Sequence, residues 1–123
     1  MPNKNILLVE DDPFLADIYT KKLQQAGFDV TVADNGEQAL KDADNVAFDL
    51  VLLDIVMPYI DGWEILKRIK SPKAKNHPKV IIFSNLGQSS EVKKGLDLGA
   101  DKYLIKANFT PSEVVEEIKK VIL

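Results

Sequence analysis

Short apolar runs alternate along the chain with segments of helical periodicity. Four runs of three or four apolar residues each end at a polar side chain: Ile6–Val9, Leu50–Leu53, Val80–Phe83 and Tyr103–Ile105. Runs of this length, bounded by polar or turn residues, predict buried strands of a parallel sheet. A fifth strand is predicted at Phe28–Ala33.

Helix signals lie between the predicted strands. The predicted helices cover roughly residues 13–26, 36–42, 62–71, 89–98 and 111–122. The last has the clearest start, because Thr110, Pro111 and Glu113 supply an N-cap threonine, an N1 proline and an N3 glutamate. Asn35 to Gln38 resembles a capping box for the second helix, and Gly27 and Gly99 mark two helix ends.

This order gives five consecutive strand–helix units in one domain, residues 1–123. Such alternation predicts right-handed crossovers and a sheet covered on both faces. We therefore expect an α/β fold of the flavodoxin-like, doubly wound (βα)5 type, with a five-stranded parallel sheet in the order 2-1-3-4-5. That order places the ends of the first and third strands side by side, and so Asp11 beside Asp54.

Composition removes several functional classes. The chain has no cysteine and one histidine, His77, which excludes disulfides, thiolate zinc sites and histidine metal clusters. With a net charge of −3 and dispersed basic residues, direct nucleic-acid binding is not expected. No apolar stretch reaches membrane-spanning length, and Met1–Asn5 lacks the apolar core of a signal peptide. A soluble cytoplasmic protein is the expectation.

The polar residues after the strands have complementary chemistry. Ligands of open parallel sheets bind beyond the carboxyl ends of the strands, and these ends carry Glu10, Asp11, Asp54, Ser84 and Lys106. Crowded carboxylates repel one another, and a hard cation with oxygen ligands, Mg²⁺, relieves that repulsion. Asp54, at the centre, is then suited to attack a phosphoryl group and form an aspartyl phosphate.

The other groups at this edge fit the same reaction. Lys106 and the Ser84 hydroxyl are suited to stabilise charge on phosphoryl oxygens. Each residue alone is weak evidence, since single acids after strands are often turn or cap residues. We assign that simpler role to Asp12, as an N-cap, and to Asp34.

Four stretches of the chain resemble the receiver domain of two-component response regulators, and the likeness covers almost the whole sequence. They are Ile6-Leu7-Leu8-Val9-Glu10-Asp11-Asp12, Leu53-Asp54-Ile55-Val56-Met57-Pro58-Tyr59-Ile60-Asp61-Gly62, Phe83-Ser84-Asn85, and Gly99-Ala100-Asp101-Lys102-Tyr103-Leu104-Ile105-Lys106. The resemblance implies a phospho-acceptor switch that receives its phosphoryl group from a sensor histidine kinase or phosphotransfer protein. It also implies a downstream protein partner, signalled through the face formed by helix 4, strand 5 and helix 5.

The resemblance also implies a role for each matched residue. Asp54 is the phosphorylated aspartate and a Mg²⁺ ligand, Asp11 is a direct ligand, Glu10 acts through water, and the Val56 backbone carbonyl completes the protein ligands. Ser84 is the switch hydroxyl and Lys106 binds a phosphoryl oxygen. Tyr103 is the aromatic that rotates inward when the hydroxyl moves toward the phosphate; its simpler interpretation is a static, half-buried strand residue.

Three positions depart from the family pattern. Proline usually follows the lysine through a cis peptide, whereas this chain has Ala107. We expect the cis bond to be kept despite a cost of roughly 3–4 kcal/mol. Val56 and Leu86, each two residues beyond a site residue, are apolar, so we expect them to flank the site, exclude water and prolong the aspartyl phosphate.

Charges on the signalling face bear on assembly. The DNA-binding branch of the family tends to have paired acids before the strand 5 aromatic and an arginine on the last helix, where this chain has Asp101-Lys102 and Glu117. These charges do not support the dimer that the DNA-binding branch forms, and we expect this protein to be a monomer or a weak dimer. No output domain follows Leu123 in this sequence, so we expect a stand-alone receiver acting through protein contacts.

Three alternatives belong to other functional classes. An aspartate-nucleophile phosphatase needs a second aspartate two residues after the nucleophile, where this chain has Val56. A flavin-binding electron carrier needs a hydroxyl-rich phosphate loop after the first strand. This chain has Glu10-Asp11-Asp12 there, and these acids would repel a phosphate. A degenerate receiver acting as a constitutive protein-binding module stays open because of Ala107.

Overall fold

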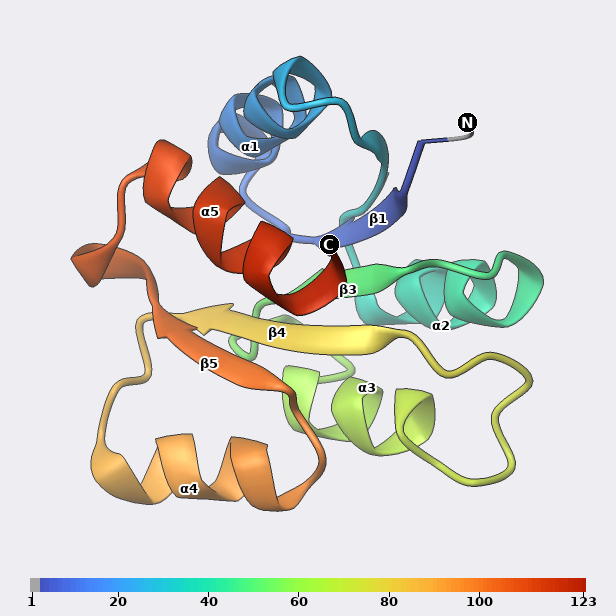
Figure 1. Ribbon diagram of the computed structural model, residues 1–123. Coiled ribbons are helices and arrows are strands. Elements are labelled where there is room, and N and C mark those ends of the chain that lie inside the picture. Colours follow the sequence, from blue (N-terminus) through green and yellow to red (C-terminus); the bar gives the residue numbers. More distant parts are fainter. Residues whose placement is uncertain (1–2) are drawn as a thin grey trace.

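A five-stranded parallel sheet in the order β2-β1-β3-β4-β5 forms the centre of the molecule (Figure 1). The computed structural model describes residues 3–123, so Met1 and Pro2 of the predicted domain lie outside the described residues. The strands are β1 (Asn5–Val9), β2 (Asp29–Ala33), β3 (Leu50–Leu53), β4 (Lys79–Ser84) and β5 (Lys102–Ile105). The predicted fold class and strand order are confirmed.

Five helices connect and follow the strands. They are α1 (Pro13–Gln25), α2 (Gly36–Asn45), α3 (Gly62–Ile69), α4 (Ser89–Asp97) and α5 (Pro111–Ile122), and a 3₁₀ turn, η1 (Lys106–Asn108), precedes α5. Asp12, Asn35, Asp61 and Thr110 accept a hydrogen bond from the first turn of the helix that follows them. Local capping thus starts four of the helices where the sequence predicted.

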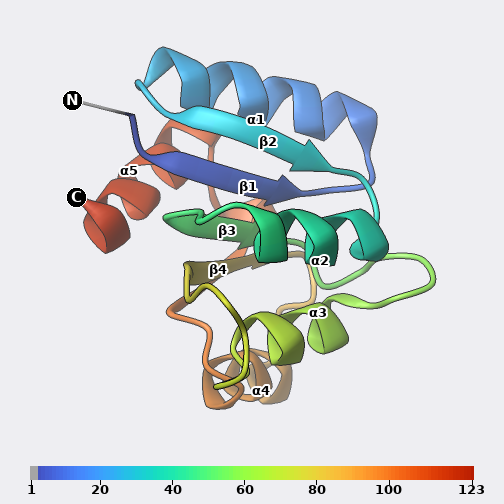
Figure 2. The ribbon, with the colours of Figure 1, turned by 90° about the vertical axis from the view of Figure 1, so that its right-hand side faces the viewer.

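The helices cover both faces of the sheet, α1 and α5 on one side and α2, α3 and α4 on the other (Figures 1 and 2). Strand residues alternate between two apolar cores because successive side chains point to opposite faces. Ile6 and Leu8 join the α1/α5 core, whereas Leu7 and Val9 join the α2/α3 core. Burial of both faces explains the uninterrupted apolar runs.

Two local predictions need correction. The helix expected to end near Asp42 continues to Asn45. The expected capping box at its start is half formed: Asn35 accepts from the Gln38 backbone N–H, but the Gln38 side chain donates to Asp42. That contact is an ordinary i, i+4 pair on a helix, and it competes with the box for the same side chain.

The strand register brings the functional residues to one edge. Val9 pairs with Leu53, and Ser84 pairs with Ile105, so the residues after β1, β3 and β5 and the last residue of β4 lie together. Between residues 3 and 123, no helix has the length and apolar character needed to cross a membrane.

Candidate functional site

Three acidic residues meet at the carboxyl edge of the sheet. Glu10 and Asp11 follow β1 and Asp54 follows β3, and one carboxylate oxygen from each lies within 4.8 Å of the others. Glu10 and Asp54 are buried, at 5% and 8% exposure, whereas Asp11 is exposed. The prediction that β1 and β3 juxtapose these acids is confirmed by the register.

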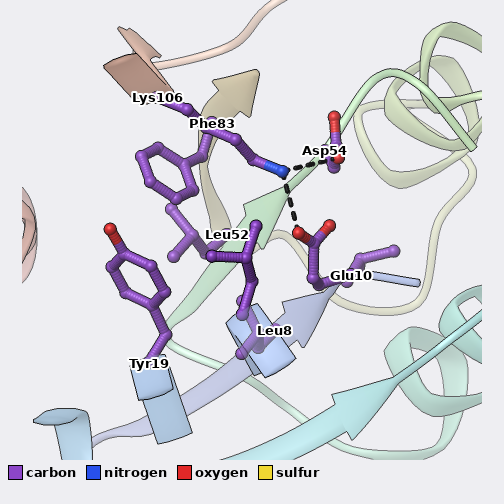
Figure 3. Close-up of a pocket in the computed structure, with 9 residues that line it drawn as sticks. Leu8, Glu10, Tyr19, Leu52, Asp54, Phe83 and Lys106 are labelled. Carbon is purple, nitrogen blue, oxygen red and sulfur yellow. Dashed lines mark hydrogen bonds and ion pairs between the residues drawn. The ribbon is translucent and has the colours of Figure 1, made fainter. Parts of the chain in front are cut away.

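One ammonium group bridges two of the three acids. Lys106 Nζ lies 2.8 Å from Glu10 Oε1 and 2.8 Å from Asp54 Oδ2 (Figure 3). Its side chain is 13% exposed, and its Nζ lies 5.6 Å from the centroid of the Phe83 ring. Lys106 therefore reaches the centre of the site from the end of β5, as the sequence predicted.

Burial and charge shift the acid–base behaviour of this cluster. Burial, together with the nearby Asp54 carboxylate, raises the pKa of Glu10 to about 7, although Lys106 opposes the rise. Burial alone would lower the pKa of Lys106, but its hydrogen bonds to Asp54 and Glu10 outweigh burial and raise it. Lys106 is accordingly a stable cation beside Asp54 at neutral pH.

The loop after β3 fixes the central aspartate. Asp54 Oδ1 accepts a hydrogen bond of 3.1 Å from the Val56 N–H, so its second oxygen is the one that Lys106 contacts. Gly62 holds the far side of this loop, since its N–H donates to the Ile55 carbonyl at 2.9 Å. A Cβ at Gly62 would lie 2.4 Å from the Ile55 Cα, so only glycine permits this approach.

The loop after β4 links the hydroxyl to the aromatic residue of β5. Ser84 is fully buried, and its Oγ accepts a hydrogen bond of 3.2 Å from the Leu86 N–H. The Leu86 carbonyl accepts a hydrogen bond from the Tyr103 hydroxyl. Both polar groups of the Leu86 backbone are thus hydrogen-bonded to Ser84 and Tyr103, the two residues for which the family resemblance implies a switch role.

The peptide before Ala107 corrects one prediction. No cis peptide occurs in the described part of the chain, so the bond between Lys106 and Ala107 is trans. A cis bond before a non-proline residue is costly, and the trans loop still brings Lys106 to both acids. The departure from the family pattern therefore does not displace the lysine.

Asn85 is a residue that sequence reasoning missed. Its Oδ1 accepts a hydrogen bond of 3.1 Å from the Ala107 N–H, a donor that proline would lack. This bond joins the loops after β4 and β5 beside Lys106. Asn85 lies directly after Ser84, but its hydrogen-bond partner is 22 residues away in the sequence and no local signal identifies it.

The two apolar positions near the site differ in exposure. Val56 is 59% exposed beside Asp54, whereas Leu86 is half-buried and packs against the α2/α3 core. On the other side, Leu8, Tyr19, Leu52 and Phe83 form an apolar wall around the Lys106 ion pairs (Figure 3). The centre of the site is therefore shielded mainly from the α1 side.

The donor set suits a hard divalent cation. Within residues 3–123, Glu10 Oε2 is buried and has no hydrogen-bond partner, and Lys106 pairs with two of the three clustered carboxylates. A buried, unpaired carboxylate oxygen is costly, and a cation held by oxygen ligands would satisfy it. Residues Glu10, Asp11 and Asp54 fit Mg²⁺ on this ground.

Comparison with known proteins gives one family. The model of the response regulator receiver domain matches residues 6–119. The chain is 33% identical over 120 residues to the alkaline phosphatase synthesis transcriptional regulatory protein PhoP of Bacillus subtilis, covering 98% of this chain and 49% of PhoP. It spans about half the length of the curated relatives it matches.

Solved structures agree. The receiver domain of the Francisella response regulator 1452 matches with a TM-score of 0.89 at 31% identity, covering 98% of this chain and 97% of that one. The receiver domain of the sensor histidine kinase PA1611 from Pseudomonas aeruginosa matches with a TM-score of 0.86 at 26% identity, covering 98% of each chain. That structure holds a magnesium ion coordinated in its active-site cleft.

Proposed function

This chain belongs to the receiver domain family of response regulators, and on that premise we propose that Asp54 is its phosphoryl acceptor. The observation that carries the proposal is the position of Asp54: a buried carboxylate held by the Val56 N–H and Lys106, with two further acids within 4.8 Å. The donor is a sensor histidine kinase or a phosphotransfer protein.

The reaction moves one phosphoryl group between two side chains. An Asp54 carboxylate oxygen attacks the phosphorus of a phosphohistidine, the nitrogen–phosphorus bond breaks, and the imidazole leaves with the electron pair. Lys106, 2.8 Å from Asp54 Oδ2, neutralises charge that develops on the phosphoryl oxygens. Water later attacks the phosphorus of the acyl phosphate, and the bond between phosphorus and the Asp54 oxygen breaks, which releases inorganic phosphate and restores the carboxylate. In this proposal the protein catalyses only its own phosphorylation and dephosphorylation.

Mg²⁺ is the cofactor that this reaction needs. Asp11, Asp54 and the Val56 backbone carbonyl would hold the ion, with Glu10 acting through water. When bound, the ion neutralises the acidic cluster and the incoming phosphoryl oxygens. The support is the oxygen-only donor set and Glu10 Oε2, which has no hydrogen-bond partner in the part of the chain that the structure describes.

The signal passes through Ser84 and Tyr103 to the face formed by α4, β5 and α5. Ser84 turns toward the phosphoryl group, which frees the Leu86 N–H, and the Tyr103 hydroxyl holds the Leu86 carbonyl. On this face Glu117 accepts from Lys102 at 2.9 Å and from Lys120 at 2.8 Å. These charges are paired within the chain, which favours a downstream protein partner over a charge-paired dimer.

Phosphorylation can be measured directly. We expect the intact mass to rise by one phosphoryl group when the protein is incubated with a small acyl phosphate and Mg²⁺, and the rise to disappear in Asp54→Asn. Asp34→Asn, an exposed acid after β2 at the same edge, is the matched control and keeps the adduct. An adduct in Asp54→Asn, or none in the wild type, contradicts the proposal; the latter outcome fits a constitutive binding module.

Decay of the same adduct measures its lifetime. We propose a long-lived aspartyl phosphate, because apolar Val56 and Leu86 offer no group to position an attacking water. Val56→Asn combined with Leu86→Glu should speed the decay, and an unchanged rate would overturn this part. A cytoplasmic location, and what the whole protein does with the signal, stay predictions.

A further inference from the structure

Gly95 in α4 leaves a space that the Tyr103 ring fills. Gly95 is buried, and a Cβ built on it would lie 2.9 Å from Tyr103 Cδ2 and 3.2 Å from Tyr103 Cε2. The same Cβ would lie 2.5 Å from the Cδ1 of Ile82 in β4. Real Cβ contacts are essentially never shorter than 3.0 Å, so any larger residue forces Ile82 or Tyr103 to move.

The position of the ring decides what the hydroxyl can reach. With its ring against Gly95, Tyr103 donates a hydrogen bond to the Leu86 carbonyl, and the Leu86 N–H donates to Ser84 Oγ. A continuous series of contacts therefore runs from the buried hydroxyl of the phosphorylation site to the backbone of α4. Gly95 is the end of that series.

We propose that Gly95 is a positioning residue for the Tyr103 switch: its missing side chain leaves the space that the Tyr103 ring occupies in its inward position. A glycine inside a helix is otherwise unfavourable relative to alanine, so local helix stability does not explain it. The proposal rests on the proposed function, because the inward ring matters only if Ser84 and Tyr103 respond to phosphorylation.

Tyr103 is the side chain that a methyl group at residue 95 would displace. Ile82 is fully buried in the α2/α3 core, where neighbouring side chains fill the space around it. Tyr103 is half-buried and has solvent on one side. In Gly95→Ala the ring should turn outward and release the Leu86 carbonyl.

Fluorine NMR of protein labelled with 3-fluorotyrosine tests this in the unphosphorylated protein. The chain has three tyrosines, and two of them calibrate the H₂O-to-D₂O shift: Tyr59 is fully exposed and Tyr19 is 6% exposed. Tyr103→Phe assigns the third signal. We expect the Tyr103 solvent shift to lie between the two references in the wild type and to approach that of Tyr59 in Gly95→Ala.

Two further variants keep the test decisive. Leu96→Ala changes the next, 46% exposed residue of α4 and should leave the Tyr103 signal in place. Ile82→Val removes the Cδ1 atom that a Cβ at residue 95 would approach most closely, so in this background the nearest atoms to the added methyl group are those of the Tyr103 ring. A Tyr103 signal that stays put in both Gly95→Ala proteins overturns the proposal.

The coupling to the site has its own measurement. In this proposal a bound phosphoryl group favours the inward position of Tyr103, and by linkage the inward position favours phosphoryl binding to the same extent. Displacement of the ring should therefore weaken phosphoryl binding. We expect Gly95→Ala in the Ile82→Val background to weaken apparent binding of Mg²⁺ with beryllofluoride, a phosphoryl mimic, by about five- to tenfold. The loss should vanish when Tyr103 is also alanine.

The outcomes separate the two proposals. A wild-type protein that forms no phosphoryl adduct and binds no beryllofluoride contradicts the proposed function. The fluorine spectra test the position of Tyr103 independently of that result. If the wild type binds the mimic and Gly95→Ala binds it equally well, Gly95 does not position the switch.

Discussion

Acidic side chains are paired with hydrogen-bond donors at the amino ends of the strands and crowded together at the carboxyl ends. At the amino ends, Asp101 Oδ2 accepts from the Val80 N–H at 2.8 Å and from Lys70 at 2.9 Å, and Asp49 accepts from the Asn5 N–H at 2.7 Å. At the carboxyl ends, Glu10, Asp11 and Asp54 lie within 4.8 Å of one another, and Lys106 pairs with Glu10 and Asp54. The acids are satisfied at one edge and crowded at the other.

The pKa shifts show what this difference does to stability. Burial alone would raise the pKa of Asp101, but the Val80 N–H and Lys70 outweigh it and hold this pKa below its ordinary value, so the ionised group stabilises the fold at neutral pH. The pKa of Glu10 is raised to about 7 mainly by burial, so its ionised form destabilises the fold. The paired acids at the amino ends stabilise the sheet. The acids at the carboxyl ends are brought together by the fold and are suited to bind a cation.

The largest expected effect is at the amino edge. Asp101→Ala should lower the free energy of unfolding by about 2–3 kcal/mol, because it leaves the buried Val80 N–H without an acceptor and removes the partner of Lys70. Asp101→Asn keeps an acceptor for Val80 and should lose less. Chemical denaturation at neutral pH measures both.

An exposed ion pair is the control for this substitution. Asp97 pairs with Lys93 along α4 and its side chain is 62% exposed, so Asp97→Ala should change the free energy of unfolding by less than about 0.5 kcal/mol. If Asp97→Ala and Asp101→Ala lowered the free energy of unfolding equally, Asp101 would contribute no more than an exposed ion pair.

The next effect is the pH dependence at the carboxyl edge. Between the ordinary pKa of 4.5 and about 7, the native Glu10 binds a proton that the unfolded chain has released, so stability falls as pH rises through this window. In EDTA, the metal-free protein should lose roughly 2 kcal/mol between pH 5 and pH 8 from this group. Glu10→Gln should lack that loss; an identical pH profile in both proteins contradicts the assignment.

The smallest effect is that of the cation. Mg²⁺ should raise the free energy of unfolding by about 1.4 kcal/mol at ten times its Kd, because it binds the native acidic cluster and not the unfolded chain. Asp11→Asn should remove most of this gain, whereas Asp101→Asn should keep it. Stabilisation by Mg²⁺ that survives in Asp11→Asn would mean that the ion binds elsewhere.

Much of the fold and the site could be predicted because the signals are local. Apolar runs marked each strand, and caps such as Asp61 and Thr110 marked helix starts within a few residues. The candidate acids, hydroxyl and lysine followed from their positions at strand ends. The second helix was predicted too short because its last turn depends on distant contacts: Ala43 packs against the core, and the carbonyls of Ala43 and Val46 accept hydrogen bonds from the Asn76 side chain.

Features that depend on distant contacts could not be predicted. The trans bond at Ala107 goes with a hydrogen bond to Asn85, which lies in another loop. The orientation of the half-buried Leu86 depends on the core beside β4, and the fit of Tyr103 depends on a glycine in α4. None of these residues has a neighbour in the sequence that reveals its partner.

The order of strands and helices, the family, and the side chains at the strand ends can all be predicted from the amino-acid sequence, because they follow from hydrophobic period, capping and motif spacing. How those side chains share one space depends on contacts between distant parts of the folded chain. The tertiary structure set Lys106 between Glu10 and Asp54, left Glu10 Oε2 without a partner among the described residues, and placed the Tyr103 ring against Gly95. Burial and charge act through distance in the folded chain, which spacing along the sequence does not measure.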